Sequence, residues 1–79
     1  MRTITTPAHI GALLASRRKH LKLSQSQVAE KVGISQNRLS VLETDPAALD
    51  MKKLLAWLNA LGLDMTVGER GTDKSKVEW

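Results

Sequence analysis

The chain has 79 residues and a mass of 8.7 kDa, which fits one small domain and excludes a two-domain enzyme. It has no cysteine, which excludes disulfides, iron–sulfur clusters and thiolate zinc sites. Its net charge of +4 is unevenly distributed along the chain. Residues 1–43 hold seven Lys/Arg and two Asp/Glu, whereas residues 44–79 hold five Lys/Arg and six Asp/Glu. This asymmetry indicates either a polyanionic partner, of which nucleic acid is the first candidate, or a basic surface that is solvated and binds no partner.

The first two helices are predicted by their end signals. Thr6 followed by Pro7 is typical of a helix start, and apolar residues at helical spacing extend this helix over 7–20. Ser24, with Gln27 three positions later, forms a capping box for a second helix. Gly33 ends that helix, since a left-handed backbone costs little only for glycine.

Two further helices follow the same logic. Ser35 caps a third helix, and a loop is expected over 44–48. Asp50 then caps a fourth helix over 51–61, which Gly62 stops.

The fourth helix carries more apolar residues than three short helices need to cover. Its stripe consists of Met51, Leu54, Leu55, Leu58 and Leu61, and Trp57 widens it. The stripe indicates either a fully buried core helix or a face shared with a second copy, and we favour some contribution to a dimer.

The hydrophobic period changes after the fourth helix. Leu63, Met65 and Val67 alternate with polar residues or glycine, as in a half-buried strand. A single strand in a helical chain has no pairing partner in its own subunit, so we expect it to pair with the same strand of a second copy. The chain thus divides into a helical domain, a dimerisation strand and a polar, flexible tail, over 1–62, 63–68 and 69–79.

Only two residues, Gly33 and Ile34, join the second and third helices. Counted from Gln25, small or apolar residues stand at positions 4, 5, 8, 9, 10, 15 and 18. They are Val28, Ala29, Val32, Gly33, Ile34, Leu39 and Leu42. In this spacing the segment resembles the helix-turn-helix of the lambda-repressor/Cro (XRE) family. The resemblance implies an all-α, lambda-repressor-like DNA-binding domain of four to five helices, completed by the C-terminal β-strand that pairs across a homodimer.

The resemblance also assigns DNA contacts to outward-facing residues. The third helix would enter the major groove with five base-contacting candidates, Ser35, Gln36, Asn37, Ser40 and Val41. The amides of Gln36 and Asn37 suit adenine, and Val41 suits a thymine methyl group.

Phosphate contacts are expected from six residues around this helix, Lys22, Ser24, Gln25, Gln27, Lys31 and Arg38. Gln25 is also expected to brace Gln36, and the N–H groups near Ser24 and Gln25 to bind a phosphate. Arg18 and Glu43 occupy the places of a structural ion pair of the family.

Across nearly its whole length the chain also resembles HipB-type antitoxins, in its helical domain, short strand and polar tail that ends in Glu78-Trp79. This resemblance implies a dimer that binds palindromic operator DNA, represses its operon and neutralises a HipA-type serine/threonine kinase toxin. Glu78 and Trp79 would contact that toxin, with Trp79 as the anchor.

Two other functions remain open, a stand-alone, phage-like repressor without a toxin and a protein-interaction adaptor that binds no DNA. No enzyme, cofactor or metal site is expected, because His9 and His20 are isolated from any acidic cluster and no catalytic motif is present. No apolar run approaches the roughly 20 residues of a membrane span, and the N-terminus lacks a signal-peptide core. We therefore expect a cytoplasmic, nucleoid-associated protein with no membrane partner.

Overall fold

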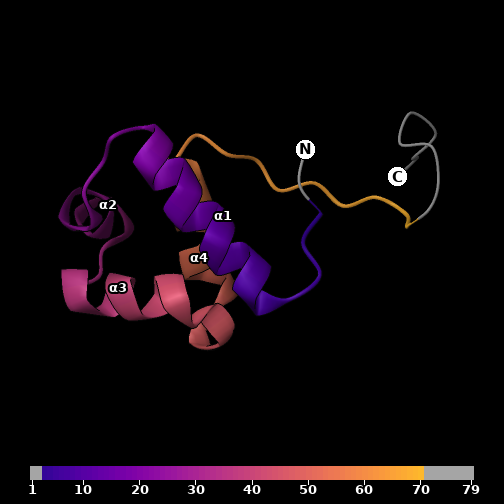
Figure 1. The fold of residues 1–79 in the computed structure, drawn as a ribbon, viewed down its shortest axis with the longest axis horizontal. Coiled ribbons are helices and arrows are strands. Elements are labelled where there is room, and N and C mark those ends of the chain that lie inside the picture. The colour runs from indigo at the N-terminus through magenta and orange to yellow at the C-terminus, as the bar shows by residue number, and fades with distance from the viewer. Residues whose placement is uncertain (1–2, 71–79) are drawn as a thin grey trace.

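The computed structural model describes residues 3–70 and contains five helices in that range (Figure 1). In chain order they are α1 (Pro7–His20), α2 (Gln25–Val32), α3 (Gln36–Thr44), the 3₁₀ helix η1 (Pro46–Ala48) and α4 (Met51–Ala60). The all-α prediction of four to five helices is confirmed. The loop expected over 44–48 is instead the end of α3 followed by η1, because Pro46 is buried and favours the first position of a short helix.

The helix ends follow the predicted local chemistry. Each α-helix begins at a side-chain oxygen that accepts the N–H three residues later, on Thr6, Ser24, Ser35 and Asp50. Gly33 and Gly62 are left-handed, with φ of 87° and 70°. Lys22 occupies the equivalent place after α1 with φ of 59°, a conformation that costs a non-glycine residue about 1 kcal/mol.

A single core joins the helices, with Trp57 of α4 fully buried among aliphatic side chains. Its other buried apolar members are Leu14, Val28, Ala29, Val32, Leu39, Leu42, Leu54, Leu58 and Leu61. α2 packs against α4, and α1 packs against α3, so that α2 and α3 are held at one end of the molecule (Figure 1).

The apolar stripe of α4 is divided between the core and the surface. Leu54 and Leu58 are buried, whereas Met51 is 61% exposed and Leu55 is 47% exposed. The interpretation of α4 as a fully buried core helix is therefore wrong for this single chain. Met51 and Leu55, one turn apart on α4, form an apolar strip that is exposed at the surface.

The segment after α4 leaves the helical domain and runs away from it (Figure 1). Residues 63–69 form no strand within residues 3–70, and Met65 and Val67 are exposed. A strand that pairs with a second copy thus stays a prediction. The division at residue 62 also stays a prediction, and the tail beyond residue 70 lies outside the described residues. No helix among the described residues is long and apolar enough to cross a membrane.

Gly11 lies where α1 crosses the end of α3. A Cβ atom on Gly11 would overlap the carbonyl oxygen of Glu43 and press on Pro46. We expect Gly11→Ala to lower the free energy of unfolding by about 1–3 kcal/mol, because backbone must move to admit the methyl group. Urea denaturation checks this expectation. Ala12→Ser, at the exposed neighbouring position, is the control, and equal stability of Gly11→Ala and the parent protein would contradict the close crossing.

Candidate nucleic-acid interface

The two helices of the predicted motif are locked together by their apolar positions. Val28, Ala29 and Val32 of α2 and Leu39 and Leu42 of α3 are all buried, and Ile34 packs against the same core. The N–H groups of Gly33 and Ile34 both donate to the Ala29 carbonyl, at 2.8 and 3.0 Å. These bonds close the turn after α2 and set the direction in which α3 begins.

The outward face of α3 presents the predicted base-contacting residues to solvent. Ser35, Gln36, Asn37 and Val41 are exposed, and Ser40 is half-buried. The Ser35 hydroxyl accepts the N–H of Arg38 at 3.1 Å, which leaves its own O–H proton to donate elsewhere. Val41 is 53% exposed on this otherwise polar face. The face therefore offers amide donors and acceptors together with an apolar contact, the groups that read base edges in a major groove.

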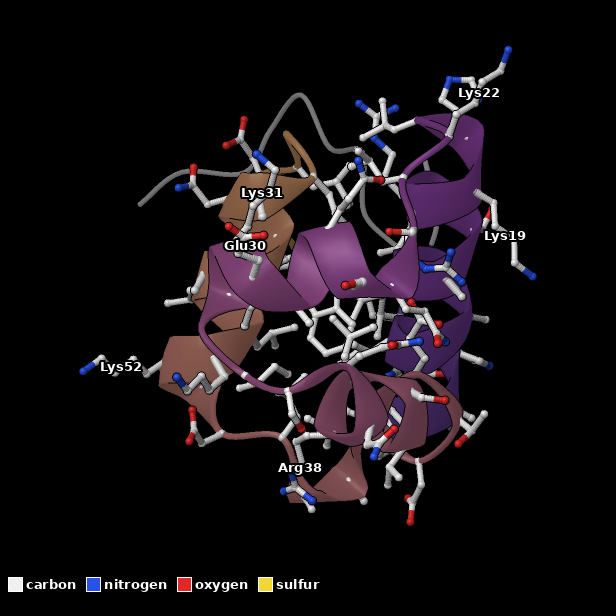
Figure 2. All side chains as sticks on the ribbon, turned by 90° about the vertical axis from the view of Figure 1, so that its left-hand side faces the viewer. Lys19, Lys22, Glu30, Lys31, Arg38 and Lys52 are labelled. Carbon is white, nitrogen blue, oxygen red and sulfur yellow. The ribbon has the colours of Figure 1, made fainter. Side chains whose placement is uncertain are left out.

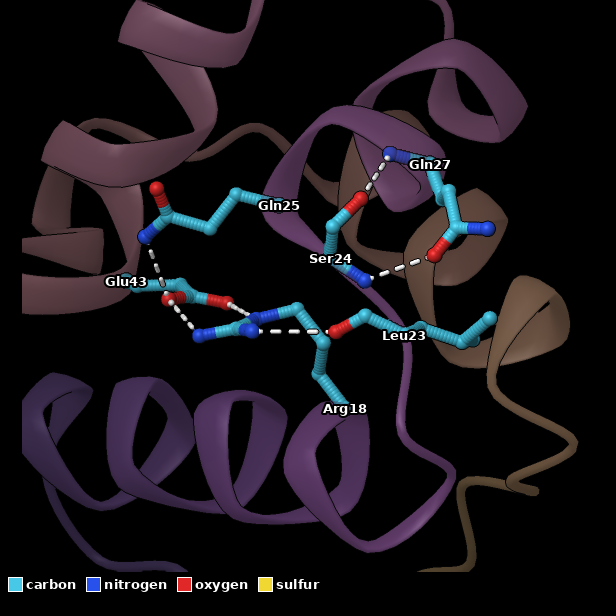
Figure 3. Close-up of polar contacts among 6 residues, drawn as sticks. All are labelled: Arg18, Leu23, Ser24, Gln25, Gln27 and Glu43. Carbon is cyan, nitrogen blue, oxygen red and sulfur yellow. Dashed lines mark hydrogen bonds and ion pairs between the residues drawn. The ribbon is translucent and has the colours of Figure 1, made fainter.

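The N-terminus of α2 differs in one respect from the prediction. The Ser24 hydroxyl accepts the Gln27 N–H at 3.0 Å, and the Gln27 side-chain oxygen accepts the Ser24 N–H at 2.8 Å (Figure 3). The predicted capping box is confirmed. The Ser24 N–H is not open to a phosphate, because Gln27 already occupies it, and for the Gln25 N–H the expected phosphate contact stays a prediction.

A partly buried polar network connects α1, α2 and α3 (Figure 3). Arg18 donates from Nε and Nη2 to the two Glu43 carboxylate oxygens, at 2.7 and 3.2 Å, and from Nη1 to the Leu23 carbonyl. The Gln25 amide donates to Glu43 at 3.1 Å. The two charged side chains are only 12% and 5% exposed, so the predicted structural pair is present. Gln25 braces Glu43 rather than Gln36, which corrects the sequence interpretation.

Of the exposed basic side chains, Arg38 lies on α3 itself, whereas Lys31 lies on the side of α2 away from α3 in Figure 2, and Lys22 precedes α2. Lys22, Lys31 and Arg38 are exposed and spread over the side of the molecule shown in Figure 2. Glu30 lies beside Lys31 in the same view, so the surface is basic with one acid among its labelled side chains. All six predicted phosphate-contacting residues are at least partly exposed. Gln25 is half-buried, and its amide donates a hydrogen bond to Glu43.

Arg17 is a structurally important residue that sequence reasoning missed. Its Nε donates to the carbonyl of Leu61 at 3.1 Å, at the end of α4. A cation at this place satisfies an orphan carbonyl and complements the helix dipole. The only sequence signal was a basic residue at helical spacing, which does not identify a partner 44 positions away.

The histidines occupy unrelated places. His9 and His20 are exposed on α1, and the Nδ1 atom of His9 accepts the Thr5 N–H at 3.1 Å. Among residues 3–70, no three His, Asp or Glu side chains gather into a group that could hold a metal ion.

Comparisons with known proteins agree with this geometry. The chain superimposes on a chain of the HipA–HipB–O2–O3 complex with a TM-score of 0.81 at 26% identity, over 89% of this chain and 99% of that one. It superimposes on a chain of the HipB–O1–O2 complex with a TM-score of 0.80 at 26% identity, over 87% and 100% of the two chains. The predicted resemblance to HipB is thus confirmed. Among curated proteins, no sequence matches this chain.

The family model for the helix-turn-helix domain HTH_3 matches residues 14–67. This range is more than half of the chain and includes both helices of the motif, the turn between them and α4. The chain belongs to the HTH_3 helix-turn-helix family.

Proposed function

We propose that this protein is a dimeric DNA-binding antitoxin. As such it represses its own operon at a pseudo-palindromic operator and neutralises a HipA-type serine/threonine kinase toxin. The observation that carries the DNA-binding half is the exposed, amide-bearing face of α3 on a buried helix-turn-helix frame. The likeness to HipB chains, in complexes with HipA and with the sites O1, O2 and O3, supports the rest.

The proposed DNA complex places α3 in the major groove. Gln36 and Asn37 stand at its N-terminal end, where their amides can pair with an adenine edge. Val41 lies one turn later and offers its methyl groups to a thymine. Lys31 and Arg38 neutralise phosphates, which position the domain but carry no sequence information.

The proposed dimer covers apolar groups that the single chain leaves exposed. Met65 is 46% and Val67 is 68% exposed on a segment whose backbone has no ladder partner among residues 3–70. Antiparallel pairing with a second copy would satisfy this backbone and cover both side chains. Met51 and Leu55 of α4 are further apolar groups for the same contact. A two-fold dimer would present two copies of α3 to half-sites about 34–36 Å apart.

The proposed toxin contact uses Glu78 and Trp79, which lie outside the described residues. An indole at the end of a polar chain can supply most of the energy of a small contact when a pocket buries it. This assignment rests on the resemblance to HipB in its complex with HipA.

A two-part experiment tests the proposal. The N-terminally tagged chain is used to capture partners from its host, and the purified protein is titrated with DNA upstream of its own gene and with a shuffled duplex of equal length. We expect capture of a kinase-sized partner and preferential binding of the upstream DNA. Specific DNA binding without a kinase would instead identify a stand-alone repressor. A protein partner without DNA binding at any salt concentration would identify an adaptor.

Gln36 provides the sharpest test of base recognition. We expect Gln36→Ala to weaken binding to the upstream DNA by about 1–3 kcal/mol, or roughly 5- to 150-fold, because a bidentate contact to a base is lost. Binding to the shuffled duplex should change little. Ser26→Ala, at an exposed position of α2 that we assign no DNA contact, is the control. Equal losses on both duplexes would remove the base-reading role of Gln36.

A further inference from the structure

Two lysines from the acidic half of the chain lie beside the helix-turn-helix. Lys52 and Lys53 belong to the first turn of α4, some twenty positions after the turn between α2 and α3. The Lys53 ammonium nitrogen nevertheless lies 3.8 Å from the place that a Cβ atom on Gly33 would take. Lys52 is exposed and projects from α4 next to that turn (Figure 2). The fold thus adds two cations to the turn that directly precedes the DNA-reading helix.

Neither ammonium group is neutralised by an ion pair within residues 3–70, where the one such pair is Arg18–Glu43. Asp50 is the nearest acid along the helix, and its carboxylate accepts the backbone N–H of Lys53 at 2.7 Å. This bond occupies one N–H of the first turn and places a carboxylate at the helix end, so an anion bound here would be held mainly by the two lysine side chains. Lys53 is half-buried against Gly33, whereas Lys52 extends freely into solvent.

The position of these lysines relative to α3 indicates what they bind. In Figure 2, Lys22 lies at the upper right and Lys52 at the left, with α2 between them and α3 below α2. The Lys53 ammonium lies beside Gly33, at the C-terminal end of α2, which is opposite the end that carries Ser24 and Gln25. A helix inserted in a major groove about 12 Å wide is flanked by a phosphate backbone on each side. With α3 in the groove as proposed, the start of α2 would face one of these backbones, and the first turn of α4, at the other end of α2, would face the other.

We propose that Lys52 and Lys53 bind DNA phosphates on the strand opposite the one contacted by the start of α2, so that the domain holds both rims of the groove. This inference rests on the proposed DNA-binding function and extends its contact surface to α4. Each contact releases condensed counterions from the DNA, so it contributes to the salt dependence of binding and not to sequence preference.

Salt-dependent titrations test the inference with Lys52→Gln, Lys53→Gln and the double variant. Affinity for the upstream DNA and for the shuffled duplex is measured between 50 and 200 mM salt, the range over which phosphate contacts dominate affinity changes. We expect each single variant to flatten the slope of log affinity against log salt by about 0.9, and the double variant by about twice that amount. The ratio of specific to non-specific affinity should stay unchanged. Thermal unfolding of each variant verifies that it is folded.

Lys19→Gln is the matched control, because it removes the same charge from an exposed lysine at the opposite edge of the face (Figure 2). Slopes of the α4 variants equal to the parent slope, or changed only as much as in Lys19→Gln, would overturn the inference and leave the proposed function standing. A parent protein that binds neither duplex would overturn both. A changed specificity ratio would mean that the lysines contact bases, which also contradicts the phosphate role.

Discussion

Glu43→Ala is expected to lower the free energy of unfolding by about 3–5 kcal/mol. The substitution removes the carboxylate partner of Arg18, whose side chain is only 12% exposed in the parent protein. It also removes the acceptor of the Gln25 amide. A buried charge that loses its partner is costly because water does not replace the lost contact. Since domains of this size are marginally stable, the change is a large fraction of the total. Urea denaturation measures the loss, and the protein concentration is held fixed because the proposed dimer would make stability depend on concentration.

A double variant separates the cost of the orphaned charge from the value of the pair. Arg18→Met combined with Glu43→Leu should be more stable than Glu43→Ala alone, because apolar side chains of similar volume replace both charges. Glu30→Ala, which removes an exposed acid from α2, is the control and should change stability by less than about 0.5 kcal/mol. A loss below about 1 kcal/mol for Glu43→Ala would place the pair among solvent-screened surface ion pairs.

Trp79→Ala is expected to lower affinity for the proposed kinase partner by about 2–4 kcal/mol, or roughly 30- to 700-fold, while affinity for DNA stays unchanged. The reason is that a single buried aromatic anchor can dominate a contact made by a short polar segment. Calorimetric titration of the kinase with the parent protein and the variant measures the effect. Trp79→Phe should keep part of the affinity, since it retains the apolar ring but loses the indole N–H.

The matched control for the tail is Ser75→Ala, which changes a small polar residue of the same segment. A loss smaller than about threefold for Trp79→Ala would refute the anchor role and move the proposed toxin contact to the helical domain. A parallel loss of DNA affinity would show that the tail affects the DNA-binding face.

The sequence predicted the helix positions well because their ends depend on local chemistry. Thr6, Ser24, Ser35 and Asp50 each cap a helix through a bond that spans three residues, and such a bond depends little on the rest of the chain. Gly33 ends α2 for an equally local reason, since its φ of 87° suits a residue without Cβ. The apolar spacing around that glycine was sufficient to predict both helices and the exposed face of α3.

Side-chain partners far apart in the sequence were not predictable in this way. Gln25 donates to Glu43 and not to Gln36 because the packing of α2 on α3 brings the carboxylate within 3.1 Å. Likewise, the α4 stripe was recognised, but only the packed structure separates buried Leu58 from exposed Leu55. The sequence determined which faces are apolar or polar, since that follows from helical period and composition.

What only the tertiary structure decided is how distant faces meet. Summed charge assigned the basic surface to residues 1–43, yet the packing of α4 against α2 brings the Lys53 ammonium to Gly33. A pattern along one helix contains no information about the crossing of two helices, which depends on the joint fit of many side chains. The helix-turn-helix was therefore evident from local spacing, whereas the full extent of its basic surface depended on long-range packing.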